Sequence, residues 1–300
     1  MKKNVLIAAL AAICACSGCS LFGKKEKDEA LKVLMIGNSF SVSMLQHAPA
    51  VAASLGLRLD LASRYIGGCS LERHWDNAQK DSDRSFLPYG YVRNSEGKIK
   101  RGRENILAAL RSEKWDVVTI QQVSGLSWKK DSYHPFGDEI VAKIRELAPT
   151  AKIYIQETWS YTPWDKRLEK WGIDQNEMYA KLREAYADFA RQHSLETIRM
   201  GTAVQEWRKR LPVKYTENSF GGDVVGGGRQ AKSDLFKRDP DNKWVPNCDV
   251  FHLSRGGEYF QALVWIAKLF GADVRRCEYR PDFVTEEHDK LMKKIADELK

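Results

Sequence analysis

The sequence predicts a single α/β domain in which helices cover both faces of a mostly parallel β-sheet. Short apolar runs alternate with helix-forming stretches about five times along the chain, an order typical of βαβ units. The chain has 300 residues, of which 43% are hydrophobic and 29% charged. This composition is that of a folded globular protein and argues against a disordered chain or a multi-span membrane protein. We expect the domain to span residues 32–300.

The first strands and helix follow from local sequence patterns. Residues 32–36 (KVLMI) form a short apolar run that ends at Gly37, as expected of a buried parallel strand. Residues 44–55 have the spacing of a helix, which ends at Gly56. Residues 58–64 predict the second strand.

Three more strands are predicted, each preceded by helix-forming sequence. The strands are 115–122 (WDVVTIQQ), 151–157 (AKIYIQE) and 195–200. The preceding helices are about 104–112, a segment that ends near Leu147, and 176–191. Residues 257–269 and 285–300 predict two closing helices.

Two polar stretches, 77–100 and 214–247, interrupt this alternation. We expect both to be long loops at the rim of the sheet, where lids and binding loops often lie. The second stretch contains the glycine triplet 226–228. The triplet follows no clear strand and has no Lys-Ser/Thr partner, so a flexible loop is favoured over a phosphate cradle.

The N-terminus has the pattern of an export signal. Residues 1–18 carry two lysines and then an apolar run that is too short to span a bilayer. The run ends in ICACSGC, which resembles the lipobox of bacterial lipoproteins, whose cysteine is diacylated and becomes the mature N-terminus. Cys19 is the expected lipidation site, with Cys16 or an ordinary secretory signal as alternatives. Residues 19–31 would be a solvated tether, and the protein would be lipid-anchored in the bacterial cell envelope.

The formal net charge of +8 comes from 48 Lys and Arg against 40 Asp and Glu. No basic block with interleaved aromatic residues and no nucleic-acid-binding motif appears, so nucleic acid is not an expected partner. The positive balance instead favours attraction to acidic glycans or anionic lipid head groups.

Beyond the signal, the cysteines are Cys69, Cys248 and Cys277. An odd count does not suit a disulfide scaffold, although Cys248 and Cys277 could pair. No cysteine spacing resembles a zinc site.

Residues that follow the predicted strands suggest a serine-hydrolase site, because ligands of open α/β sheets bind beyond the carboxyl ends of the strands. Ser39 follows the first strand and is the expected nucleophile. His252 would be the base, and Asp249, one turn before it, the carboxylate that orients the imidazole. A second Asp-x-x-His, from Asp131 to His134, lies in a polar mid-chain segment and is ranked lower.

An acyl-transfer site also needs hydrogen-bond donors for the oxyanion. The candidates are the backbone N–H groups of Ser39 and Gly68 and the side-chain amide of Gln122 or Gln121. Side chains alternate along a strand, so only one glutamine should face the site. Gln122 is favoured because it lies closer to the strand end.

Three further residues are candidates for substrate contact. Trp159, after the fourth strand, could stack on a sugar ring or simply seal the core. Glu157 could be a polar wall of the pocket or be solvated. His74 could line the pocket or be hydrogen-bonded locally.

The segments Gly37-Asn38-Ser39 and Asp249-x-x-His252 together resemble the SGNH, or GDSL-like, hydrolases. These enzymes place an N-terminal Gly-Asp/Asn-Ser nucleophile on the first strand and Asp-x-x-His on the last loop. The resemblance implies a flavodoxin-like three-layer α/β/α sandwich with a parallel five-stranded sheet, and ester hydrolysis without metal or cofactor. The phrases GNSFS, GGCSLE and HLS..G.Y look like a poorly characterised bacterial branch of exported, glycan-associated proteins. Where most members have Gly-x-Asn-Asp, this chain has QQVSG, and a glutamine can supply the same N–H.

The expected function is a serine esterase that removes an acyl group, with acetyl favoured, from a carbohydrate. The exported setting, the aromatic rings and the basic balance favour this carbohydrate deacetylation. One alternative is a lipid or thioester hydrolase with the same mechanism. The other is a non-catalytic glycan-binding envelope lipoprotein that keeps the fold.

Overall fold

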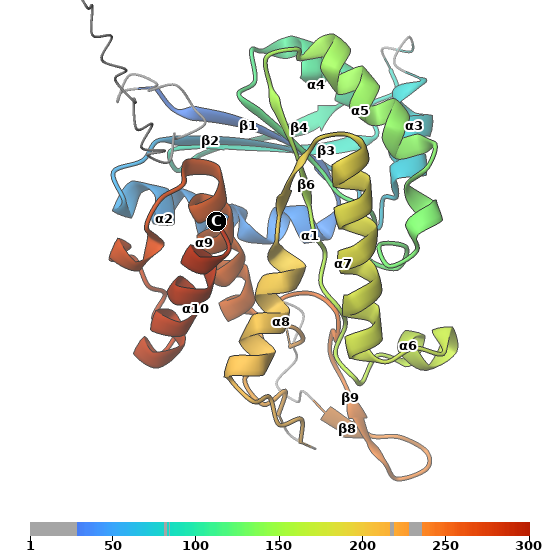
Figure 1. Cartoon of the computed structure of the whole chain (residues 1–300), viewed down its shortest axis with the longest axis vertical. Coiled ribbons are helices and arrows are strands. Elements are labelled where there is room, and N and C mark those ends of the chain that lie inside the picture. The colour runs from blue at the N-terminus through green and yellow to red at the C-terminus, as the bar shows by residue number, and fades with distance from the viewer. Residues whose placement is uncertain (1–28, 81–82, 84, 217–218, 228–235) are drawn as a thin grey trace, which may run out of the picture.

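The computed structural model describes residues 29–80, 83, 85–216, 219–227 and 236–300. A seven-stranded sheet lies at its centre, and helices pack on both of its faces (Figure 1). Its strands are β1 (Leu31–Gly37), β2 (Leu59–Tyr65), β3 (Tyr89–Ser95), β4 (Lys98–Glu104), β5 (Val117–Ile120), β6 (Lys152–Gln156) and β7 (Glu196–Ile198). The helices are α1 (Ser39–Val42), α2 (Ala48–Ser54), α3 (Leu71–Ala78), α4 (Ile106–Ser112), α5 (Phe136–Leu147), α6 (Lys166–Trp171), α7 (Gln175–Gln192), α8 (Met200–Arg210), α9 (Arg255–Phe270) and α10 (Glu286–Glu298). Short 3-10 turns are η1 (Ser43–Gln46), η2 (Lys130–Tyr133) and η3 (Val274–Arg276).

The predicted α/β sandwich is confirmed. Five strands are parallel and lie in the order β2-β1-β5-β6-β7, which is the flavodoxin-like order. β1 is almost entirely buried in the middle of the sheet, which explains its continuous apolar sequence. The carboxyl end of β1 lies at the edge of the sheet where ligands of such folds bind.

The sheet has seven strands rather than five, because part of the expected loop 77–100 forms a hairpin with the residues after it. β3 pairs antiparallel with β2 and with β4, and the turn at Glu96 and Gly97 has positive φ at both residues. A two-residue turn of this kind suits the twist of a hairpin. The strands were missed because β4 is an exposed, highly charged edge strand with no apolar run.

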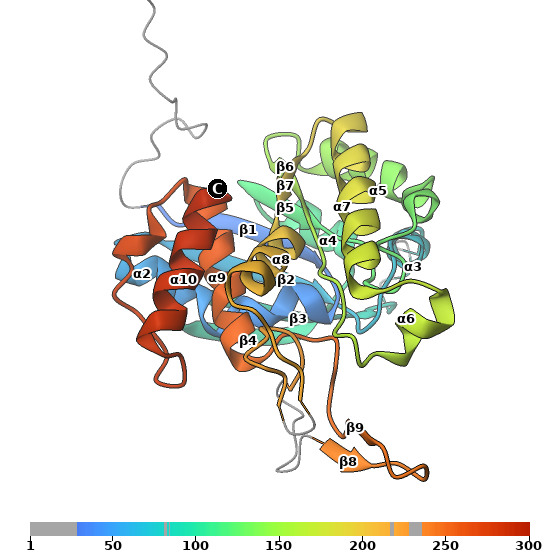
Figure 2. The same ribbon diagram turned by 60° about the horizontal axis from the view of Figure 1, so that its bottom comes forward.

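The second expected loop, 214–247, also contains a hairpin. β8 (Phe236–Arg238) pairs with β9 (Trp244–Pro246) and projects from the body of the molecule (Figure 2). The helix expected over 44–55 is divided into η1 and α2, since Pro49 stands in the first turn of α2.

Several expectations concern the chain outside this sheet. The signal segment 1–18, Cys19 and most of the tether 19–31 lie outside the described residues. Within the described ranges, no helix is long and apolar enough to cross a membrane. Cys248 and Cys277 are not disulfide-bonded, so the bridge considered from the sequence is wrong.

Candidate active site

The candidate nucleophile lies in the tight connection between β1 and α1. The side chain of Asn38 caps α1 by accepting a hydrogen bond from the backbone N–H of Phe40 at 3.1 Å. Its amide nitrogen donates to the carbonyl of Cys69 at 3.0 Å. Asn38 therefore fixes the turn that presents Ser39 as the first residue of α1.

The structure brings Ser39, His252 and Asp249 together in one hydrogen-bonded chain. Ser39 Oγ lies 2.7 Å from His252 Nε2, and His252 Nδ1 is hydrogen-bonded to Asp249 Oδ2. The other carboxylate oxygen, Oδ1, accepts the backbone N–H groups of Phe251 and His252, each at 2.9 Å. These contacts have the connectivity of a nucleophile, a base and an orienting carboxylate.

The electrostatics of Asp249 suit the orienting role. Burial by itself would raise its pKa, but hydrogen bonds from the His252 ring and from two backbone N–H groups lower it, and the net pKa lies below the ordinary value. Asp249 is therefore a carboxylate at neutral pH. It can hold the proton of His252 on Nδ1, which leaves Nε2 free to accept the proton of Ser39.

Aromatic rings hold the imidazole of His252 in place. The ring lies edge-on to Phe40, with centroids 5.2 Å apart, and 4.2 Å from the ring of Phe251. Phe40 in turn stacks on Trp159 at 4.1 Å, and Trp159 Nε1 donates to the Phe251 carbonyl at 2.8 Å. Trp159 is fully buried, so the expected alternative of contact with a sugar ring is wrong. Trp159 seals the core, as the other alternative predicted, and its contacts support the ring of His252.

Two glycines support the loop that carries Asp249 and His252. The N–H of Gly226 donates to the carbonyl of His252 at 2.8 Å, and the N–H of Gly227 donates to that of Asp249 at 2.9 Å. Both glycines have positive φ, at 91° and 64°. A flexible loop was expected at these glycines, and their role as a backbone support was not predicted. The run of glycines was the signal for it in the sequence.

The loop after β2 meets the nucleophile connection and brings Gly68 beside it. The backbone N–H of Ile66 donates to the carbonyl of Gly37 at 3.3 Å, and the Cys69 carbonyl accepts from Asn38. Gly68, between these two contacts, is exposed. A Cβ atom at Gly68 would have no other atom within 4 Å, so the space beside it is open. Gly68 and Ser39 therefore lie on two connections that are hydrogen-bonded to each other.

The expectation that Gln122 supplies the third donor is wrong. Gln122 is buried, its oxygen accepts the Leu71 N–H at 3.1 Å, and its nitrogen donates to the Ser132 carbonyl at 2.7 Å. Gln121 is the glutamine that faces the nucleophile connection, and its nitrogen donates to Asn38 Oδ1 at 2.6 Å. The strand alternation was correct, but the choice between the two side chains was not.

A buried amide chain extends from Gln121 to α9 and was not anticipated. Gln121 Oε1 accepts from Gln156 Nε2 at 2.6 Å, and Gln156 Oε1 accepts from Trp265 Nε1 at 2.6 Å and from Gln261 Nε2 at 3.0 Å. Gln261 also donates to the carbonyl of Phe40 at 2.8 Å. The chain fixes the position of the nucleophile connection through buried hydrogen bonds to Asn38 and to the carbonyl of Phe40. Its only signal in the sequence was a set of glutamines inside otherwise apolar segments.

Two other expected pocket residues are buried away from any substrate. His74 is 1% exposed, and Nδ1 is hydrogen-bonded to the Tyr89 hydroxyl at 2.9 Å. Burial lowers the pKa of His74 to about 3, so the ring is neutral. Glu157 is 3% exposed and accepts the backbone N–H and the hydroxyl of Thr202 at 2.8 and 2.9 Å. His74 is therefore hydrogen-bonded locally, the second of its two expected settings, and does not line the site. Glu157 is neither a wall of the pocket nor solvated.

The second Asp-x-x-His sequence does not form an Asp–His dyad. His134 Nδ1 is hydrogen-bonded to Asp138 at 2.8 Å, and His193 Nε2 contacts the same carboxylate at 2.6 Å. The carboxylate partner of His134 is thus Asp138 and not Asp131. This leaves Asp249 and His252 as the candidate pair.

Comparison with known proteins places the chain in a family. The family model described as a domain of unknown function, DUF4886, matches residues 32–224, more than half of the chain. The chain belongs to the DUF4886 family. A crystal structure of a DUF4886 family protein from Bacteroides uniformis is similar, with 28% sequence identity, a TM-score of 0.73 and coverage of 90% of this chain and 94% of that chain.

Two further solved structures resemble this DUF4886 protein with lower TM-scores. A candidate SGNH hydrolase from Slackia heliotrinireducens has 20% identity and a TM-score of 0.48, over 80% of this chain and 100% of that one. An acetyl xylan esterase has 14% identity and a TM-score of 0.46, over 77% and 96%. No curated protein matches the sequence. The DUF4886 match contains Ser39 and Gly68 and ends before Asp249.

Proposed function

We propose that this DUF4886 protein is a serine hydrolase of carboxylic esters that works by the SGNH mechanism. The observation that carries the proposal is the 2.7 Å contact between Ser39 Oγ and His252 Nε2. The other ring nitrogen of His252, Nδ1, is hydrogen-bonded to Asp249. A serine hydroxyl is a weak nucleophile until a neighbouring base can take its proton. The contact supplies that base in the required geometry.

The reaction follows from these positions. Ser39 Oγ attacks the ester carbonyl while its proton moves to His252 Nε2, and the negative charge on the carbonyl oxygen is stabilised by the N–H groups of Ser39 and Gly68. The imidazolium then gives its proton to the departing alcohol, leaving an acyl group on Ser39. A water molecule, deprotonated by His252, attacks this acyl group, releases the acid and restores the hydroxyl.

An acetylated carbohydrate remains the proposed substrate class. Ser39 and His252 are partly exposed and Gly68 is exposed, so an ester on a bulky or polymeric molecule could approach them. The positive net charge supports an acidic glycan. Trp159 is buried and offers no surface to a sugar ring.

Mutation of the three site residues tests the mechanism. With p-nitrophenyl acetate and an acetylated oligosaccharide as substrates, Ser39→Ala and His252→Ala should lower kcat/KM by about 10³-fold or more, and Asp249→Asn by a similar factor. His134→Ala is the matched control, because it removes the histidine of the other Asp-x-x-His, and it should retain activity. Hydrolysis unchanged in Ser39→Ala would contradict the mechanism. Sugar binding by a wild-type protein that cleaves no ester would favour the glycan-binding alternative.

We also propose that the chain is exported and anchored to the cell envelope through a lipid on Cys19. The support is the charged start, short apolar run and lipobox-like ICACSGC of the sequence.

A further inference from the structure

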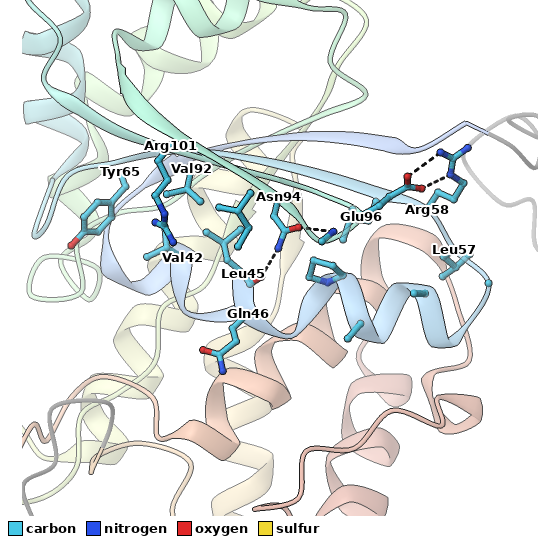
Figure 3. Close-up of a pocket in the computed structure, with 17 residues that line it drawn as sticks. Val42, Leu45, Gln46, Leu57, Arg58, Tyr65, Val92, Asn94, Glu96 and Arg101 are labelled. Atoms are coloured by element: carbon cyan, nitrogen blue, oxygen red, sulfur yellow. Dashed lines mark hydrogen bonds and ion pairs between the residues drawn. The ribbon is translucent and has the colours of Figure 1, made fainter.

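A groove of about 1040 Å³ lies between the β3–β4 hairpin and the segment that runs from α1 through η1 to α2 (Figure 3). It exists because the hairpin extends the sheet sideways, while α2 faces it with small side chains, among them Ala50 and Ala53. Binding sites for small molecules in proteins typically measure about 300–1,000 Å³. The groove is therefore large enough for an organic ligand.

The lining of the groove is mainly apolar. The wall opposite the hairpin contributes Leu45 from η1, Ala50 from α2 and Leu57 from the connection after α2. The hairpin contributes Val92 and Ile99. Ile99 is 55% exposed, the highest value among the large apolar side chains of the described residues. An exposed apolar side chain in a concave surface is a common feature of ligand-binding sites. An aliphatic chain suits this lining better than a sugar.

A hydrogen bond between the two walls holds the groove at a fixed width. The side-chain nitrogen of Asn94 on β3 donates to the carbonyl of Leu45 in η1 at 3.2 Å. Its oxygen accepts the N–H of Gly97 in the hairpin turn at 3.0 Å. Asn94 is 6% exposed, so these bonds are shielded from water. The groove is thus formed before any ligand binds, which lowers the entropic cost of binding.

The charges at the groove favour an anion. β4 carries Lys98, Lys100, Arg101 and Arg103, while its one acidic residue, Glu104, pairs with Arg64. At the far end of the groove, Arg58 and Glu96 form an ion pair and largely cancel each other.

Arg101 is the cation best placed to meet a ligand. It points from β4 into the groove near Val42 and Tyr65 (Figure 3), and no carboxylate in the described part of the chain forms an ion pair with it. Lys100, the next residue along β4, points to the opposite face of the hairpin, because side chains alternate along a strand. A negative head group can therefore reach Arg101 while the rest of the ligand occupies the groove.

We propose that the groove binds a long-chain carboxylate, with its aliphatic chain along α2 and its carboxylate at Arg101. Burial of the chain against the apolar walls provides most of the affinity, and the charge-assisted contact with Arg101 selects the anion. This binding role goes beyond the proposed esterase and does not require Ser39.

Titration of the purified protein with cis-parinaric acid, a fluorescent long-chain carboxylate, tests the site. We expect saturable binding that dodecanoate displaces at a lower concentration than dodecanol, by about fivefold or more. Arg101→Gln should remove this difference, whereas the control Lys100→Gln should keep it. Equal displacement by both compounds in the wild-type protein would overturn the assignment of Arg101.

Variants that fill or open the groove test the position of the chain. Ala50→Trp should weaken binding about tenfold or more, and the control Ala180→Trp, on an exposed position of α7, should not. Ile99→Ser removes exposed apolar surface from the groove and should also weaken binding. Because Ile99 lies on an edge strand, this variant provides the test if Ala50→Trp does not fold. Binding that survives both changes would overturn the groove as the site.

Ser39→Ala should bind the probe like the wild-type protein, so failure of the esterase mechanism and failure of this proposal give different results.

Discussion

Gly37 and Asn38 show why the residues before Ser39 are restricted. A Cβ atom at Gly37 would lie 2.6 Å from the hydroxyl of Ser41, which itself donates to the Asn38 carbonyl at 2.8 Å. A side chain at this position would force the Ser41 side chain to move and would disturb this hydrogen bond. In the motif Gly-Asn-Ser, the first two residues therefore determine how the connection packs, and Ser39 supplies the hydroxyl.

Gly226→Ala tests whether the backbone support of the Asp249–His252 loop matters for catalysis. The positive φ of Gly226 disfavours a side chain, and a Cβ atom would lie 3.0 Å from the ring of Phe220. We expect a loss of about 1–3 kcal/mol in the free energy of unfolding and a clear fall in kcat, because the loop must shift. Urea unfolding and ester hydrolysis measure the two effects.

Gly172→Ala is the matched control for that prediction. Gly172 also has positive φ, at 64°, but it ends α6 and has open space around it. Its substitution should lower stability through backbone strain and leave kcat unchanged. Equal kcat in the Gly226 and Gly172 variants would show that the glycine support is not needed for the site.

At the scale of elements, the β3–β4 hairpin is attached to the parallel sheet by ion pairs as well as by its ladder. Arg93 on β3 forms ion pairs with Asp60 on β2 and with Glu113 after α4, and Lys32 also contacts Glu113 at 2.9 Å. The hydrogen bond from Arg93 lowers the pKa of Glu113 from 4.5 to about 2. Glu113 therefore stabilises the fold in its charged form.

Glu113→Gln tests this attachment through its pH dependence. Because the pKa of Glu113 is lower in the folded state, its contribution is complete above pH 4.5 and is lost as the pH falls towards about 2. The variant should lose about 1 kcal/mol of stability at pH 7 and show a smaller further loss between pH 4.5 and 2 than the wild-type protein. Urea unfolding across this range measures both. The control Glu146→Gln removes an exposed ion pair with Lys143 and should change neither the stability at pH 7 nor its pH dependence. Identical pH profiles of stability for Glu113→Gln and the wild-type protein would show that Glu113 does not attach the hairpin.

The elements that the sequence predicted well are those with a strong burial signal. β1, β5 and β6 are short, buried and apolar, and the structure places each within a few residues of its expected range. β3 and β4 were not predicted because β3 joins the sheet by pairing with β2, a strand distant from it in the chain. Local sequence carries little information about such contacts.

At the scale of the whole molecule, the proposed lipid anchor on Cys19 can be tested directly. Metabolic labelling with a radiolabelled fatty acid should mark the wild-type protein and the Cys16→Ser variant, and should not mark Cys19→Ser. The reason is that only the lipobox cysteine becomes the acylated N-terminus. Labelling that disappears in Cys16→Ser and persists in Cys19→Ser would assign the anchor to the alternative cysteine.

The sequence by itself determined the chain order of the five parallel strands and the residues that could act as nucleophile, base and carboxylate. These depend on local periodicity and on short motifs, which a single sequence displays directly. Only the tertiary structure decided which glutamine faces the Ser39 connection and that Trp159, Glu157 and His74 are buried. It also decided that Gly226 and Gly227 support the loop that carries Asp249 and His252. It also created the groove beside α2. These features come from contacts between segments far apart in the chain, and the direction of each side chain is set by the neighbours that it meets only after folding.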